Sequence, residues 1–219
     1  MMSLQVQITI WKESYSFMKI IGLMGGVGSG KSTVADILEK KYGAHLIITD
    51  DIAKKLYEKG EEGYHRIVSY FGNEILSENG EINRKKLSEI VFADKEKLKK
   101  LNSFIHPLVM ESVLDVIEEI KLANENKTKE QQVPYIVIET AILIEAGYRD
   151  LCDTVWYVAV DEEVRKQRLM NIRGYSEAKI DAILKNQMSD KDFSDNCDKI
   201  LYNNGELYDL EKEIQFLLV

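Results

Sequence analysis

The sequence has few cysteines, no long apolar run and no long basic run. Its two cysteines, Cys152 and Cys197, lie far apart without metal-ligand spacing, which favours reduced thiols in a cytoplasmic protein. The histidines, His45, His65 and His106, do not suggest a metal site. No apolar stretch reaches the roughly 18–20 residues of a transmembrane helix, so we expect no membrane partner. The net charge of −8 argues against nucleic acid, whose phosphates demand clustered Lys and Arg.

The remaining composition is that of a globular protein, with 45% apolar and 30% charged residues. A chain of 219 residues can bury one core together with an inserted subdomain. Residues 1–17 carry Lys12 and Glu13 and have no basic start followed by an apolar run, so they do not resemble a signal peptide. We expect them to be an extension outside the core.

A glycine-rich loop follows the first apolar run, residues 19–24. Gly25, Gly30, Lys31 and Ser32 fit the phosphate-loop pattern of Gly, four residues and Gly-Lys-Ser/Thr. Apolar residues at helical spacing follow the loop, and Gly43 can end that helix. Strand, loop and helix therefore occur in the order that a phosphate-binding loop requires.

The residue types suit ATP and Mg²⁺. Glycines at 25, 26, 28 and 30 allow positive φ and leave the backbone N–H groups uncrowded around a polyphosphate. The following helix directs its positive end at the phosphates, Lys31 should reach the β- and γ-phosphates, and the Ser32 hydroxyl should bind Mg²⁺. The predicted nucleotide-binding residues of the loop are Gly26, Val27, Gly28, Ser29, Gly30, Lys31, Ser32 and Thr33.

Two carboxylates, Asp50 and Asp51, follow the apolar run 44–49, which predicts a buried parallel strand. Open α/β sheets bind ligands at the carboxyl ends of their strands, which makes these carboxylates candidates for the active site. Alternatively, one of them caps the helix predicted to begin at Ile52. Both interpretations can hold, one for each Asp.

Roughly eighty residues separate this strand from the next one, at 135–140, far more than one crossover helix needs. The pattern predicts helices at 83–93 and 94–104. A third, long helix should begin at His106-Pro107, with Pro107 at its first position and a buried stripe from Val109 to Ile120. We interpret residues 51–132 as a helical insertion that binds the second substrate.

Further strands are predicted at 154–160 and 199–202, and helices at 162–171 and 176–188. Arg165, Arg168 and Arg173 fall in this helical hairpin, which is either a lid over the phosphates or a solvated basic face. The last helix should bury Leu207, Leu210, Ile214 and Leu217. The predicted fold is therefore α/β, with a three-layer phosphate-loop core around a five-stranded parallel sheet. The core comprises 18–50, 133–163 and 195–219, and the lid 164–194.

From about Met18 to its end, the sequence resembles the dephospho-CoA kinase family. The phosphate loop is shared with many kinases, whereas the segments 80–87 and 106–108 are more specific. The other residues that carry the resemblance are 21–23, 50, 52–53, 90–92, 143–145, 167–170, 187–188 and 203–205. The resemblance implies transfer of the ATP γ-phosphate to the ribose 3′-hydroxyl of dephospho-CoA, the last step of coenzyme A synthesis.

The resemblance also implies roles for individual residues. Asp50 should accept or orient the proton of the attacking hydroxyl, and Arg168 should neutralise the transferring phosphoryl group. Asn204 should contribute to the nucleotide site. Arg84 is placed either to meet a CoA phosphate or on a solvated face, and His106 either contacts substrate or is structural.

Three departures from the family pattern accompany this resemblance. Ile48 stands where a first carboxylate is common, Ala141 begins the segment that is often Pro-Leu-Leu, and Ile172 replaces a second lid Arg. Asp51 or Glu139 could supply the carboxylate that is missing at Ile48. A related kinase for another nucleoside or nucleotide, or an ATP-binding module without catalysis, are the alternatives; a GTPase is disfavoured because no Asn-Lys-x-Asp signature occurs. We expect a monomer or a small homo-oligomer.

Overall fold

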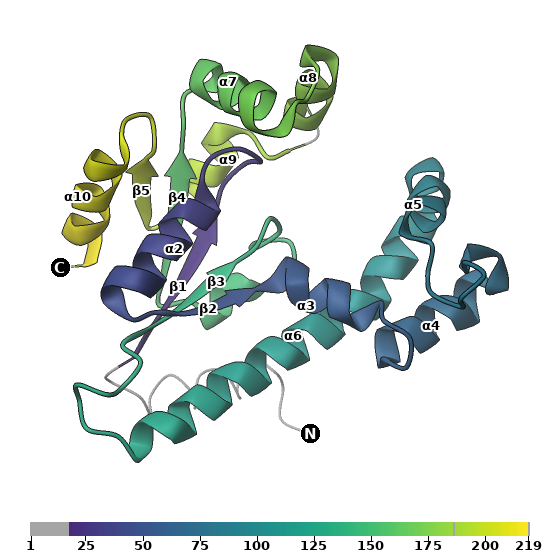
Figure 1. Ribbon diagram of the computed structural model, residues 1–219, viewed down its shortest axis with the longest axis horizontal. Coiled ribbons are helices and arrows are strands. Elements are labelled where there is room, and N and C mark those ends of the chain that lie inside the picture. Colours follow the sequence, from purple (N-terminus) through teal and green to yellow (C-terminus); the bar gives the residue numbers. More distant parts are fainter. Residues whose placement is uncertain (1–17, 186, 219) are drawn as a thin grey trace. The chain divides into compact units, whose positions relative to one another are not determined.

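The computed structural model describes residues 18–185 and 187–218, and all that follows concerns these residues. They form two compact units, one from the residues up to 47 and from 127 onward, the other from residues 48–126 (Figure 1). The predicted N-terminal extension, 1–17, lies outside the described residues. No helix in the described part is long and apolar enough to cross a membrane.

The first unit is built on a five-stranded sheet with the order β2-β3-β1-β4-β5 (Figure 1). Its strands are β1 (Lys19–Met24), β2 (His45–Ile48), β3 (Tyr135–Glu139), β4 (Thr154–Ala159) and β5 (Lys199–Tyr202). The central strand β1 pairs in parallel with β3 and β4, and β4 pairs in parallel with β5. The α/β class and the five parallel strands predicted from the apolar runs are thus confirmed.

Burial of the strands follows their place in the sheet. All residues of β1 after Lys19 are buried, as in a parallel strand covered on both faces. The edge strand β2 differs, because only Ile47 of its four residues is fully buried and His45 is exposed. Our prediction of a buried strand over 44–49 was therefore wrong in extent and burial, since an edge strand has one neighbour fewer to cover it.

Helices of the first unit follow the loops that leave the carboxyl ends of the strands. They are α2 (Lys31–Tyr42), α7 (Glu162–Arg173), α8 (Glu177–Lys185), α9 (Asp190–Asp195) and α10 (Leu207–Leu218), with the 3₁₀ turn η2 (Tyr148–Leu151). The predicted helix at 162–171 ends two residues before α7 does, and the sequence pattern did not predict α9 or η2. Gly43 ends α2 with φ 68°, as predicted, and its N–H donates to Glu39 O.

The core of this unit lies between the sheet and the helices α2 and α10. It contains Ile21, Leu23, Val34, Ala35, Ile37, Leu38, Ala44, Val137, Trp156, Val158, Leu201, Leu210 and Ile214. Leu210 and Ile214 of α10 are buried as predicted, whereas Leu207 is 55% exposed. The prediction for Leu207 was wrong because it opens the helix, where the chain has just left the sheet.

The second unit is mainly helical, in agreement with the helical pattern of its sequence. Its elements are α3 (Thr49–Leu56), α4 (Glu62–Phe71), the 3₁₀ turn η1 (Asn73–Ile75), α5 (Arg84–Ala93) and α6 (Lys95–Glu125). Asn83 and Asp94 cap α5 and α6, because their side chains accept from backbone N–H groups of the first turns. An isolated bridge between Leu76 and Ile82 closes the turn between η1 and α5.

Helix α6 passes through Pro107 without ending, so our prediction of a new helix at His106-Pro107 was wrong. Proline costs one backbone hydrogen bond inside a helix. Leu101 and Ile105 before it, and Leu108 and Val109 after it, are all buried. Burial of these four side chains offsets the hydrogen bond that is lost at the exposed Pro107, so α6 is one continuous helix.

The start of α3 also differs from the prediction. The helix begins at Thr49, its N-cap position is Ile48, and no side-chain cap forms. Asp50 and Asp51 lie in the first turn, where negative charge interacts favourably with the positive end of the helix. The interpretation of either Asp as the N-cap is therefore wrong; the side chain of Asp51 instead pairs with Lys54 at 2.6 Å.

Two residues of α10 allow a test of this core. Ile214→Ala should lower the free energy of unfolding by about 2–5 kcal/mol, because Ile214 is fully buried and a cavity would remain. Phe216→Ala is the control on the same helix, with an expected change within about 0.5 kcal/mol since Phe216 is 80% exposed. Urea unfolding measures both; equal losses would contradict the assignment of α10 to the core.

Candidate active site

The phosphate loop connects β1 to α2 and has the backbone that its glycines predict. Gly28 has φ 84° and Gly30 has φ 92°, the positive region that glycine adopts without strain. The Ser29 N–H donates to Gly26 O at 3.2 Å, which closes a turn within the loop. The Ser29 hydroxyl is buried and has no hydrogen-bond partner among the described residues. An orphaned buried hydroxyl in a loop rich in backbone donors fits a site that takes a polar ligand.

Gly26 leaves room for a side chain that reaches the loop from another element. A Cβ atom at this position would overlap with the guanidinium of Arg165. The Arg165 Nε–H donates to Val27 O at 2.9 Å, and its Nη2 donates to Gln187 Oε1. Absence of a side chain at Gly26 therefore lets the buried Arg165 of α7 reach the loop backbone. The sequence analysis placed Arg165 in the lid and did not foresee this contact.

Asn203, directly after β5, supports the loop from another side. Its Nδ2 donates to Ser29 O at 2.8 Å, and its own N–H donates to Ala159 O at 2.8 Å. The predicted neighbour, Asn204, is exposed, and its Oδ1 accepts from the Asp161 N–H at 2.7 Å. A role of Asn204 in nucleotide binding stays a prediction. Asn203 could have been found from its position, because the carboxyl ends of parallel strands share one edge of the sheet.

The side chains of Lys31 and Ser32 begin α2 and lie at the loop. Lys31 Nζ donates to Gly25 O at 2.7 Å and to Gly26 O at 3.3 Å. The Ser32 hydroxyl donates to Glu139 Oε1 at 2.9 Å, and Glu139 ends β3. A hydroxyl and a carboxylate side by side offer the oxygen ligands that Mg²⁺ prefers. Since the described residues hold no group of three or more metal-binding side chains, such an ion would also need oxygens from its nucleotide.

A polar network continues from Arg165 into α9. The Tyr157 hydroxyl donates to Asp190 Oδ1 at 2.7 Å, and its ring stacks on Phe193 with centroids 5.0 Å apart. Burial, and then the hydrogen bond to Asp190, raise the pKa of Tyr157. Burial lowers the pKa of Arg165, while the charge of Asp190 opposes this shift. The carboxylate of Asp190 thus stabilises the buried cation beside the phosphate loop.

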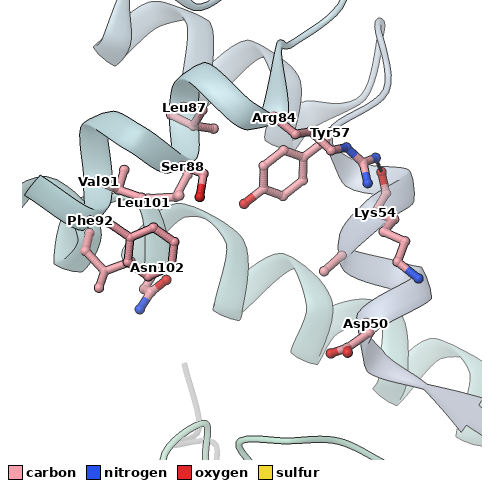
Figure 2. A pocket seen from close by; sticks show the side chains of 12 residues that line it. Asp50, Lys54, Tyr57, Arg84, Leu87, Ser88, Val91, Phe92, Leu101 and Asn102 are labelled. Atoms are coloured by element: carbon pink, nitrogen blue, oxygen red, sulfur yellow. Dashed lines mark hydrogen bonds between the residues drawn. The ribbon is translucent and has the colours of Figure 1, made fainter. Parts of the chain in front are cut away.

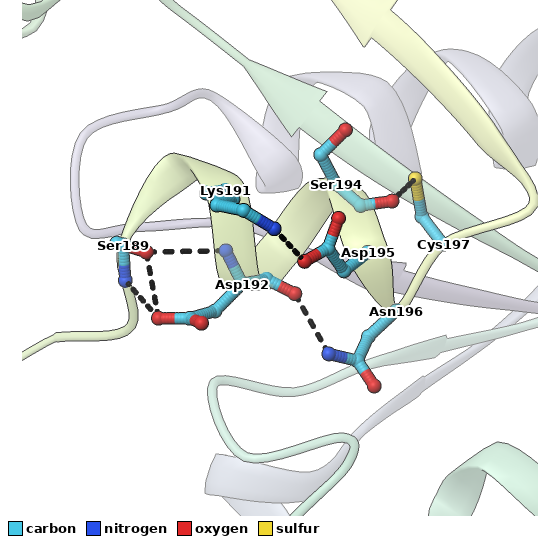
Figure 3. Close-up of polar contacts among 7 residues, drawn as sticks. All are labelled: Ser189, Lys191, Asp192, Ser194, Asp195, Asn196 and Cys197. Carbon is cyan, nitrogen blue, oxygen red and sulfur yellow. Dashed lines mark hydrogen bonds and ion pairs between the residues drawn. The ribbon is translucent and has the colours of Figure 1, made fainter.

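Helix α9, which carries Asp190, is short and fixed at both ends (Figure 3). Ser189 and Asp192 form a capping box, in which each side chain accepts from the backbone N–H of the other. At the opposite end, Asn196 Nδ2 donates to Asp192 O at 2.8 Å. These local hydrogen bonds explain how a helix of six residues can hold Asp190 in place.

The helical unit holds a pocket of about 420 Å³ (Figure 2). Its lining residues are Asp50, Ala53, Lys54, Tyr57, Arg84, Leu87, Ser88, Val91, Phe92, Leu98, Leu101 and Asn102. Arg84 Nη2 donates to Lys54 O at 2.8 Å, and the guanidinium carbon lies 5.5 Å from the centre of the Tyr57 ring. Burial raises the pKa of Tyr57, and the charge of Arg84 opposes this effect. The pocket combines an apolar wall with two cations and one carboxylate.

The structure brings some of the predicted substrate residues together. Asp50 and Arg84 line the same pocket, whereas His106 is not among the described residues that line it. His106 lies on α6, and burial lowers its pKa, which favours the neutral imidazole. Arg168 lies on α7, one turn after Arg165, and is partly exposed. The roles of His106 and Arg168 stay predictions.

Comparison with known proteins places the chain among kinases. The family model described as dephospho-CoA kinase matches residues 19–209. The chain is 37% identical over 198 residues to the dephospho-CoA kinase of Lactobacillus johnsonii, covering 90% of this chain and 96% of that protein. It is 39% identical over 196 residues to that of Fusobacterium nucleatum, covering 90% and 95%.

A solved structure agrees with these relatives. The dephospho-CoA kinase of Campylobacter jejuni aligns with a TM-score of 0.64 and 25% identity, over 91% of this chain and 94% of that one. The family match spans the phosphate loop, Asp50, Arg84 and the helices α7 and α8. The chain therefore belongs to the dephospho-CoA kinase family.

Proposed function

We propose that the protein transfers the γ-phosphate of ATP to the ribose 3′-hydroxyl of dephospho-CoA. The observation that carries this proposal is the family match over residues 19–209, which includes both the phosphate loop and the pocket that contains Asp50. The loop supplies backbone donors and Lys31 for the phosphates. The pocket supplies a carboxylate and two cations for an anionic acceptor that carries a hydroxyl.

The residues divide the reaction between them. Lys31 exchanges its hydrogen bonds with loop carbonyls for the nucleotide phosphates, whose charge it neutralises. The acceptor oxygen forms a bond to the γ-phosphorus while the bond to the β,γ-bridging oxygen breaks, and ADP departs. Asp50 accepts the proton of the attacking hydroxyl. Arg168 stabilises the negative charge of the transferring group.

Mg²⁺ belongs to this proposal through the Ser32 hydroxyl and the Glu139 carboxylate, which lie 2.9 Å apart. Both are hard oxygen ligands, and they would hold the ion together with phosphate oxygens. The ion would supply charge neutralisation on the polyphosphate. Glu139 also compensates for the carboxylate that is missing at Ile48, because it provides one at the end of the neighbouring strand β3.

The pocket of the helical unit suits the chemistry of dephospho-CoA. Leu87, Val91 and Leu101 provide an apolar wall for the uncharged parts of the acceptor. Arg84 and Lys54 can meet its pyrophosphate, since guanidinium and ammonium groups bind phosphate oxygens. We propose this assignment together with the acceptor-binding insertion at 51–132 and the lid at 164–194.

Other features of the proposal rest on the sequence. We propose a cytoplasmic location and a monomer or small homo-oligomer, without nucleic acid as a partner. There are two alternatives. The departures at Ile48, Ala141 and Ile172 motivate a kinase for another nucleoside or nucleotide, and the second alternative is an ATP-binding module without catalysis.

A panel of acceptors tests the function directly. In a coupled assay of ADP release with Mg-ATP, dephospho-CoA should support turnover, whereas adenosine, AMP and pantetheine phosphate should not. The physical reason is that each of these three lacks part of the acceptor that the pocket contacts. Turnover with another acceptor alone would replace the proposed substrate, and ATP binding without any turnover would favour the binding module.

Asp50→Asn tests the assigned proton acceptor. The amide cannot accept the proton, so kcat should fall about 10²–10⁴-fold while the Kd for ATP stays the same. Asp115→Asn is the matched control, because Asp115 is an exposed carboxylate of the same helical unit that does not line the pocket. Full activity of Asp50→Asn, or an equal loss in both variants, would overturn the assignment.

Arg84→Gln tests the acceptor pocket. Loss of the guanidinium should raise the KM for dephospho-CoA about tenfold and leave the KM for ATP unchanged, because a hydrogen bond to a charged group contributes about 1.5 kcal/mol or more. Lys85→Gln removes a neighbouring exposed cation that does not line the pocket. If both variants raise the KM equally, overall charge and not the pocket attracts the acceptor.

A further inference from the structure

Two donors at the phosphate loop converge on one side-chain oxygen. The Val27 N–H donates to Gln187 Oε1 at 3.2 Å, and Arg165 Nη2 donates to the same oxygen. The Nε–H of Arg165 meanwhile donates to Val27 O at 2.9 Å. Gln187 thus accepts from the backbone N–H of Val27, while Arg165 donates to the backbone carbonyl of the same residue.

These donors are of the kind that bind phosphate oxygens. Backbone N–H groups of glycine-rich loops form concave anion sites, and guanidinium groups bind phosphate in preference to neutral acceptors. The acceptor that they share here is an uncharged carboxamide, which carries less negative charge than a phosphate oxygen. The oxygen of Gln187 therefore satisfies donors that would interact more strongly with an anion.

Arg165 is also a buried cation. Only 7% of its surface is exposed, and its two hydrogen-bond acceptors, Val27 O and Gln187 Oε1, are neutral. Asp190 contributes negative charge nearby, but its Oδ1 already accepts from the Tyr157 hydroxyl. A buried cation is costly unless charge and hydrogen bonds compensate it. The surroundings of Arg165 thus favour an additional anion next to Val27.

We propose that Gln187 Oε1 occupies the place of an ATP phosphate oxygen, and that Arg165 is a further phosphate ligand which exchanges Gln187 for the nucleotide. Gln187 competes with ATP in this arrangement, because both need the same two donors. The exchange also releases the chain after α8 from the loop, so that nucleotide binding is coupled to the position of this segment. The inference rests on the proposed use of ATP but not on the identity of the acceptor.

Calorimetric titration with Mg-ATP, without any acceptor, tests the exchange. Gln187→Ala should bind ATP roughly threefold to tenfold more tightly, because the nucleotide no longer displaces a hydrogen-bonded group. Arg165→Gln should bind ATP roughly tenfold to a hundredfold more weakly. Gln167→Ala, an exposed glutamine of α7, is the matched control and should bind like the wild type.

Two further variants separate exchange from simple support of the loop. In the Arg165→Gln background, Gln187→Ala should give a clearly smaller gain, because one of the two shared donors is gone. Gln187→Glu should weaken ATP binding and raise the Tm of the unliganded protein, since its carboxylate would pair with Arg165 and repel phosphate. Adenosine, which has no phosphate, should bind all variants alike.

The outcomes distinguish this inference from the proposed function. Weaker ATP binding by Gln187→Ala, at an unchanged unliganded Tm, would show that Gln187 supports the loop, and would overturn the exchange. Wild-type affinity of Arg165→Gln would overturn its role as a phosphate ligand. Failure of the wild type to bind ATP would refute the proposed function as well, whereas failure to phosphorylate dephospho-CoA would leave the exchange standing.

Discussion

The close approach of side chains to a bare backbone is the constraint on which the phosphate loop depends. Arg165 reaches Val27 only because Gly26 has no Cβ, and Asn203 reaches Ser29 next to Gly30 for the same reason. Glycine in this loop therefore has two uses, positive φ and space. The loop is rich in glycine, which gives a backbone considerable freedom. Residues from α7, from the segment after α8 and from the position after β5 nevertheless hold it in place.

The supporting residues come from elements far apart in the sequence, and parallel topology explains why they meet. The order β2-β3-β1-β4-β5 brings the carboxyl ends of β3, β4 and β5 to the edge of the sheet that also carries the loop after β1. Glu139 consequently lies at Ser32, and Asn203 lies at Ser29. The ends of β3 and β5 thus each place a side chain at the loop.

Asp50 and Arg84 both belong to the separate helical unit. Asp50 follows β2 by two residues, so the carboxylate leaves the sheet at the start of α3 and lines a pocket whose other walls are helices. Arg84 enters the same pocket from α5 and binds the carbonyl at Lys54. The carboxylate lies in the first turn of α3, where negative charge interacts favourably with the positive end of the helix.

The sequence by itself determined the elements whose signals are local. The phosphate loop, the parallel strands, the Gly43 end of α2 and the helical character of residues 52–125 follow from glycine spacing, apolar runs and helical periodicity. Family resemblance in the sequence also indicated Asp50 and Arg84, which the pocket then brought together. What only the tertiary structure decided depends on packing and on contacts between distant segments. Burial of the residues on both sides of Pro107 keeps α6 continuous in spite of the local helix-breaking signal of proline. The spacing of Arg165 and Gln187 in the sequence does not reveal that they meet at Val27, because the course of the chain between them sets this contact.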